Sequence, residues 1–131
     1  HPLLENIRAG RKRSMSKRPQ HQFDRGDIVS LDMGSASTQV ACKALVLSPA
    51  AYNALGLALA VPITEHDSSR YAGFAVAIVL PGRTPASGAA LVNLVRPVDL
   101  AARGATLLGK APQTTIDEAL QRLQAVVGKD Q

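Results

Sequence analysis

The chain has 131 residues, 46% of them hydrophobic, with a formal net charge of +5 and a single cysteine, Cys42. This length suits one globular domain with one modest core, and a lone cysteine excludes an intrachain disulfide. The longest apolar run, residues 54–63, is broken by Gly56 and Pro62 and is far shorter than the roughly 20 residues that span a bilayer. We therefore expect no membrane span and a cytoplasmic protein.

The excess positive charge lies at the N-terminus. Residues 1–25 contain seven basic and two acidic residues, so the other eight basic and eight acidic residues balance. Residues 1–24 also lack apolar periodicity, and we expect a flexible basic arm that either binds nucleic acid or only solubilises the chain. Met15 suits a natural start, in which case residues 1–14 come from a tag or an upstream reading frame.

The first half of the chain predicts strands separated by turns. Alternating apolar residues between Gly26 and Gly34 predict a short strand, and residues 34–41 predict a small-residue loop. Residues 42–49 predict a strand that stops at Pro49, followed by a turn or one helical turn over residues 49–56. Residues 57–64 and 73–80 predict two further strands.

The second half predicts two more strands and the one long helix. Residues 89–96 predict a strand, residues 99–104 a short helix that ends at Gly104, and residues 105–112 a last short strand or connector. Apolar residues at helical spacing predict a C-terminal helix with one buried face: Ile116, Ala119, Leu120, Leu123, Val126 and Val127. Thr115 and Glu118 match a capping box, and Gly128 a helix stop. The predicted fold is mainly β with α, a small twisted sheet or partly open barrel closed by one helix.

The stretch VPITEHDSSRYAGFAV, residues 61–76, invites a catalytic-triad reading that its spacing does not support. A triad converges from separate elements, whereas His66, Asp67 and Ser68 are adjacent. One cysteine and three scattered histidines give no metal-ligand spacing, and we expect no metal and no cofactor. Two Phe, two Tyr and no Trp give no platform for stacking a run of bases. The residues alone leave a polar loop between two strands.

From Arg25 onward the order of segments resembles the MazF/PemK family of toxin endoribonucleases, most closely its ChpB-type branch. The resemblance rests on RGDIVSLD, ALVLSPAAYNALGLALAVPIT, RYAGFAV, ALVNLVRPVDLAARGA and DEALQRLQAVVG. It covers about 105 residues and so defines a toxin domain over residues 25–131. It implies a small SH3-like, partly open barrel with a C-terminal helix, a homodimer, and an antitoxin as protein partner. It also implies metal-independent, sequence-specific cleavage of single-stranded RNA, with the ribose 2′-OH as nucleophile.

The resemblance also implies a catalytic pair, of which one member is missing here. The family threonine that closes P-x-T is Thr64, but its catalytic arginine is replaced by Cys42, with Lys43 at the following proline. A thiol cannot replace a guanidinium that forks two phosphate oxygens. Lys43 is the nearest cation in sequence, but strand alternation directs it to the opposite face. The preceding loop is also about three residues shorter than usual and carries no glutamate.

The remaining site residues follow Thr64 in the same resemblance. His66, Ser69, Arg70 and Tyr71 would form a substrate-facing loop that contacts phosphate and stacks on or bonds a base. Asn93 and Arg96, on one strand, would complete the RNA groove. Each of these residues also has a purely structural reading. Two functions stay open: an RNA-cleaving toxin, favoured by Thr64, and a non-catalytic dimer of the same fold that binds an antitoxin or a topoisomerase, favoured by Cys42.

Overall fold

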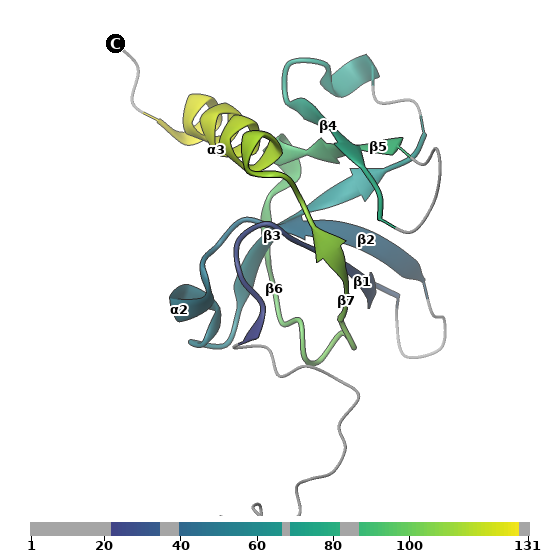
Figure 1. Ribbon diagram of the computed structural model, residues 1–131, viewed down its shortest axis with the longest axis vertical. Helices are drawn as coiled ribbons and strands as arrows, with labels where there is room; N and C mark the ends of the chain where they lie inside the picture. The colour runs from purple at the N-terminus through teal and green to yellow at the C-terminus, as the bar shows by residue number, and fades with distance from the viewer. Residues whose placement is uncertain (1–21, 35–39, 67–68, 82–86, 129–131) are drawn as a thin grey trace, which may run out of the picture.

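The computed structural model describes residues 22–34, 40–66, 69–81 and 87–128. The element bounds are β1 (Asp27–Asp32), β2 (Ala41–Val46), α2 (Ala50–Asn53), β3 (Ala58–Thr64), η2 (Ser69–Tyr71), β4 (Ala75–Val79), β5 (Ser87–Leu91), η3 (Val92–Leu94), β6 (Arg96–Val98), β7 (Thr106–Lys110) and α3 (Gln113–Val127). The strands form one sheet in the order β4-β5-β3-β2-β1-β7, with β6 paired to β3 off this path. The sheet is curled into a half-barrel, and α3 lies against the end that carries β4 (Figure 1). The predicted fold class is confirmed.

Two apolar clusters lie on the two sides of the curled sheet, and β2 supplies both by strand alternation. Leu45 and Leu47 belong to the cluster that Ile116 and Ala119 of α3 cover. Ala44 and Val46 belong to the second cluster, together with Phe23 and residues of β1, β3 and β6. A segment buried on both faces reads as a continuous apolar run, as residues 44–47 at the end of β2 do.

Gly26 explains why the chain can enter β1 directly beneath α3. Its φ is 95°, in the left-handed region that favours glycine. Its N–H donates to the Val46 carbonyl at 2.7 Å, and its own carbonyl accepts from the Ala111 N–H at 2.8 Å. A Cβ at this position would collide with the Ile116 side chain. The missing side chain therefore lets α3 pack on the backbone of the turn.

The structure corrects the N-terminal boundary of the folded domain. Phe23, which we placed in the basic arm, is fully buried in the second cluster. Asp24, also placed in the arm, accepts the backbone N–H of Ala50 at the start of α2. The fold thus includes at least residues 22–24, and the rest of the predicted arm lies outside the described residues.

Two predictions for the second half of the chain were wrong. The expected strand over residues 89–96 is interrupted by η3, because β3 pairs with β5 near Ile63 and with β6 near Ala60. The chain must therefore shift along β3 between the two pairings. The expected helix over residues 99–104 is a turn closed by Arg103 N–H on the Asp99 carbonyl, because one turn cannot recover the cost of helix nucleation.

The C-terminal helix is confirmed, but its predicted cap is not formed. Pro112 is the N-cap residue and no side chain caps the helix, so Thr115 lies inside the first turn. The helix ends at Gly128 as predicted. Ile116 and Ala119 are buried, whereas Val126 and Val127, predicted on the same face, are 42% and 67% exposed because the sheet ends before the last turn.

Candidate functional site

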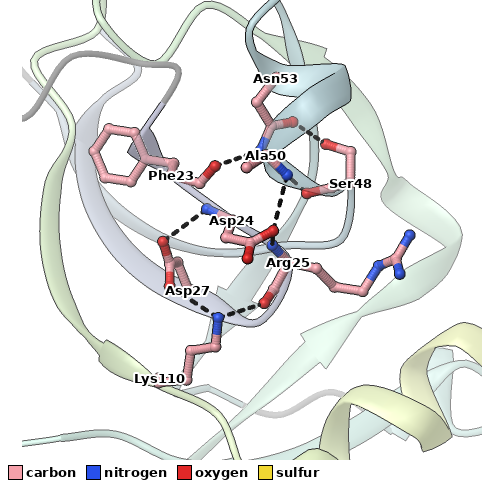
Figure 2. Close-up of polar contacts among 8 residues, drawn as sticks. All are labelled: Phe23, Asp24, Arg25, Asp27, Ser48, Ala50, Asn53 and Lys110. Carbon is pink, nitrogen blue, oxygen red and sulfur yellow. Dashed lines mark hydrogen bonds and ion pairs between the residues drawn. The ribbon is translucent and has the colours of Figure 1, made fainter.

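The motif LSPAAYN, which gives the sequence its most specific resemblance, forms a buried hydrogen-bond network that stabilises the fold. Asn53 is fully buried, and its Nδ2 donates to the carbonyls of Phe23 at 2.9 Å and Ser48 at 3.1 Å. The Ser48 hydroxyl donates to Asn53 Oδ1 (Figure 2). It also accepts the backbone N–H of Leu59 at 2.8 Å. These bonds tie the N-terminal segment to α2 and β3. Asn53 therefore stabilises the fold, and its side-chain amide is used within it.

Asp24 and Asp27, on either side of Arg25 and Gly26, add further hydrogen bonds to this network. Asp24 Oδ1 accepts the N–H groups of Arg25 and Ala50, both at 2.8 Å (Figure 2). These backbone hydrogen bonds hold the pKa of Asp24 below its usual value. Lys110 Nζ donates to the Arg25 carbonyl at 2.7 Å and pairs with Asp27 Oδ1 at 3.4 Å. The charged side chains of Asp24, Asp27 and Lys110 are thus all bonded to groups within the folded domain.

Thr64, the predicted catalytic residue, ends β3 at a shallow depression of about 360 Å³. Its neighbours across the sheet are small, with Ala89 directly opposite. A Cβ at Gly88 would lie 2.9 Å from the Thr64 carbonyl oxygen, so only glycine allows this close approach. The Thr64 hydroxyl accepts the backbone N–H of His66 at 3.1 Å. Its own proton is therefore left to donate outward.

Cys42 lies beside Thr64 on the same face of the sheet. The β2–β3 ladder pairs Lys43 with Ile63, and one further step brings Cys42 level with Thr64. Cys42 is partly exposed and packs with Met33 against the second apolar cluster. The two positions that the resemblance pairs are thus neighbours on adjacent strands, where side chains opposite each other interact.

Lys43 lies on the other face, as alternation predicts. It pairs with Glu65 at 3.3 Å, and the two side chains are 31% and 40% exposed. Its cross-strand partner Ile63 packs against the cluster beneath α3. Lys43 is therefore separated from Cys42 and Thr64 by the sheet itself.

The loop after Thr64 brings only part of the predicted set together. His66 is exposed next to Thr64 and lines the same depression. Ser69, Arg70 and Tyr71 form η2, where the Arg70 guanidinium lies 5.2 Å from the centroid of the Tyr71 ring. Arg70 is exposed and Tyr71 is half-buried. Asp67 and Ser68 lie outside the described residues.

Asn93 and Arg96 do not share a strand. Asn93 lies in η3, and its side-chain Oδ1 is buried without a hydrogen-bond partner, so this oxygen is closed to a base edge. Arg96 begins β6 opposite Ala60 and is exposed. It lines a cavity of about 150 Å³ together with Cys42 and Pro62. Arg96 thus reaches the face that carries Thr64, whereas the Asn93 oxygen does not.

Asp32 is a residue of this region that sequence reasoning missed. Its Oδ1 accepts the N–H groups of Gly34 and Val40, both at 2.9 Å. These bonds join the residue pair that lies just after β1 and just before β2. These bonds lower the pKa of Asp32. The Asp-Met-Gly spacing is typical of an Asx turn and was the available signal.

Neither a metal centre nor a membrane helix is found within residues 22–34, 40–66, 69–81 and 87–128. No group of three His, Cys, Asp or Glu side chains there could hold a metal ion. No helix in this part of the chain has the length and apolar character to cross a membrane. The candidate site rests instead on the register that puts Thr64, Cys42 and Arg96 on one sheet face.

Comparison with known proteins gives the family. Residues 24–127 match the PemK-like, MazF-like toxin of type II toxin–antitoxin systems. The chain belongs to the MazF/PemK toxin family. It is 44% identical over 111 residues to the endoribonuclease toxin ChpB of Escherichia coli K12, covering 81% of this chain and 95% of ChpB, which supports a ChpB-like branch. It is 34% identical over 116 residues to the endoribonuclease PemK of Escherichia coli, covering 84% and 86% of the two chains.

Solved MazF structures share the fold. A chain of the MazE–MazF crystal structure (Form-III) from Deinococcus radiodurans superposes with a TM-score of 0.70 at 33% identity, covering 82% of this chain and 98% of that one. The MazF structure (Form-I) from the same organism gives a TM-score of 0.65 at 32% identity, with 82% and 97% covered. The half-barrel with its C-terminal helix is thus the MazF architecture.

Proposed function

We propose that this chain is the toxin of a type II toxin–antitoxin system and cleaves single-stranded RNA at short sequences without a metal ion. The proposal is supported by membership of the MazF/PemK family and by the names of ChpB and PemK, both endoribonucleases. The observation that carries it is Thr64, whose hydroxyl lies at an open depression with its proton free to donate.

In this chemistry the ribose 2′-oxygen attacks the adjacent phosphorus, and the bond from phosphorus to the 5′-oxygen breaks. The 2′-hydroxyl loses its proton and the leaving 5′-oxygen gains one, which leaves a 2′,3′-cyclic phosphate and a 5′-hydroxyl. The protein has to position the phosphate and stabilise the charge on its non-bridging oxygens. The Thr64 hydroxyl would donate to one of these oxygens.

The residues around Thr64 would hold the neighbouring nucleotides. His66 lines the Thr64 depression, and Ser69, Arg70 and Tyr71 follow in η2. Arg70 over the Tyr71 ring presents a cation and an aromatic face together, which suits a phosphate next to an unstacked base. Asn93 would contribute through its amide nitrogen, because its oxygen is buried. Lys43 would act only at longer range, since it is paired to Glu65 across the sheet.

We propose a cognate antitoxin as the protein partner, a homodimer as the working form, and the cytoplasm as the location. Support for the antitoxin comes from the Deinococcus radiodurans neighbours, which are MazE–MazF complexes at 33% identity and 82% coverage of this chain.

The alternative, a catalytically impaired dimer that acts by binding an antitoxin or a topoisomerase, is not favoured. Cys42 in place of the arginine is the observation behind it. Against it stand Thr64, whose hydroxyl lies at an open depression, and two relatives, at 44% and 34% identity, that are endoribonucleases.

The test is cleavage of a single-stranded transcript that contains every tetranucleotide, in EDTA, by the purified protein and by Thr64→Val and Thr64→Ser. Thr64→Val removes the donor with little change of shape and is expected to lower the cleavage rate by about a hundredfold. Thr64→Ser keeps a hydroxyl and is expected to stay within about tenfold of the starting rate. The hydroxyl is partly exposed, so the melting temperature of both variants should change little. Unchanged cleavage by Thr64→Val would remove Thr64 from the mechanism.

A further inference from the structure

One cation of the folded domain differs from all the others within residues 22–34, 40–66, 69–81 and 87–128. Six Lys and Arg side chains there have a partner within the chain: Arg25, Lys43, Arg70, Arg103, Lys110 and Arg122. The Arg96 side chain makes no hydrogen bond, ion pair or ring contact with another residue of these described ranges. An exposed, unpaired guanidinium keeps its five donors for an external acceptor.

Arg96 lies at the cavity beside the missing arginine. β6 places it opposite Ala60, which is buried on the face that also carries Pro62 and Thr64. The cavity of about 150 Å³ that Arg96 lines is otherwise mainly apolar, with Met33 and Cys42 among its lining residues. Cys42 fills less of this space than an arginine would. Lys43 also contributes to the lining, but its ammonium is paired with Glu65. A phosphate entering here would therefore meet one unpaired cation and few competing polar groups, and charge interactions are stronger in such surroundings.

The spacing along β3 fits one phosphate group between Arg96 and Thr64. From residue 60, opposite Arg96, to residue 64 the strand rises about 13 Å. Thr64 lines a separate depression, so a phosphate shared by the two residues would lie over Pro62, with the Arg96 side chain extended along β3 toward Thr64. We propose, on the basis of the RNA-cleaving function above, that Arg96 is the catalytic cation of this chain and does from β6 what the family arginine does from β2.

The proposal predicts a specific pattern in single-turnover cleavage of the same transcript in EDTA. Arg96→Gln keeps a long polar side chain without charge and should cleave about a hundredfold more slowly, since one preorganised group at a developing charge typically contributes that much. Arg96→Lys keeps the charge but loses the two-pronged contact, so its cleavage rate should lie between those of Arg96→Gln and the starting protein. Arg103→Gln, the matched control, removes the same charge from an arginine already bonded to the Gly34 carbonyl and should stay within about threefold.

A double-mutant cycle with Cys42→Arg separates a shared role from a general loss of charge. Cys42→Arg alone should change the rate by less than about tenfold, because a cation is already present. In the Arg96→Gln background it should restore the rate at least about tenfold, because both side chains line one cavity. Binding of a 2′-O-methyl version of the transcript, which cannot react, should weaken less than about tenfold in Arg96→Gln. A hundredfold loss of rate with nearly intact binding identifies a group that acts in the transition state.

Each outcome decides a separate point. If the starting protein cleaves and Arg96→Gln cleaves equally fast, the role of Arg96 is refuted and the proposed function stands. If Arg96→Gln loses binding and rate in equal proportion, Arg96 only holds RNA and its catalytic role is refuted. If Arg96→Gln melts early, Arg96→Lys decides in its place, and an Arg96→Lys rate equal to that of the starting protein refutes the two-pronged contact of Arg96 with the phosphate. A starting protein that leaves the transcript intact refutes both proposals.

Discussion

Asn53→Ala should destabilise the domain strongly without touching the RNA site. The side chain is fully buried and forms hydrogen bonds with the Phe23 carbonyl, the Ser48 carbonyl and the Ser48 hydroxyl. Three bonds at about 1 kcal/mol each give a loss of about 3 kcal/mol, before any cost of the cavity. For a domain of about this size such a loss lowers the melting temperature by roughly 10 to 20 °C.

The assay is thermal and urea unfolding followed by circular dichroism. Leu55→Ala, two residues away and 81% exposed, is the control and should change the stability by less than about 0.5 kcal/mol. Below its own melting temperature, Asn53→Ala should still cleave RNA. The reasoning is refuted if Asn53→Ala melts within a few degrees of the starting protein, or if it is fully stable and inactive. Either result would contradict the purely structural role of Asn53.

Three further outcomes follow from single contacts. Backbone hydrogen bonds lower the pKa of Asp24 in the folded state. The stabilisation from the Asp24 carboxylate is therefore present above the unfolded pKa of about 3.9 and is lost as the pH falls through the folded value. Asp24→Asn should flatten the melting temperature against pH in this acidic range, and an unchanged profile there would contradict the assignment. Gly109→Ala places a Cβ 2.5 Å from Pro81 Cγ and should cost about 1–3 kcal/mol in urea unfolding, whereas a neutral result would mean that β7 shifts freely. Lys43→Ala removes a half-exposed pair with Glu65 and should change stability by less than about 1 kcal/mol and the cleavage rate by less than tenfold; complete loss of cleavage would show that Lys43 reaches the phosphate.

Strand alternation and helical periodicity predicted most elements of the fold. The runs that became β1, β2, β3 and β4 each alternate or remain apolar over the right length, and the spacing of Ile116 and Ala119 predicted α3. The break between β5 and β6 was not predictable, because it depends on which part of β3 each segment pairs with. The missing cap of α3 has a similar cause: Pro112 sets the helix start, and this moves Thr115 inward.

The candidate site was only partly predictable from the chain alone. The neighbourhood of Cys42 and Thr64 came from the family resemblance, since their positions are 22 apart in sequence and only the β2–β3 register brings them level. Alternation then predicted Lys43 on the far face, where the structure has it. The cavity shared by Cys42 and Arg96 requires β6 to lie beside β3, which no local pattern indicates. Charge counts likewise could not show that Arg96 is unpaired.

The chemical identity of the ends left on cleaved RNA tests the central claim most directly. Purified protein is incubated with the single-stranded transcript in EDTA, and the fragments are analysed by mass spectrometry, alongside a transcript with 2′-deoxyribose on the 5′ side of the mapped cleavage site. Attack by the ribose 2′-oxygen predicts fragments with a 2′,3′-cyclic phosphate and a 5′-hydroxyl, and no cleavage at the deoxyribose. Fragments with a 5′-phosphate and a 3′-hydroxyl, or cleavage at the deoxyribose, would contradict the account.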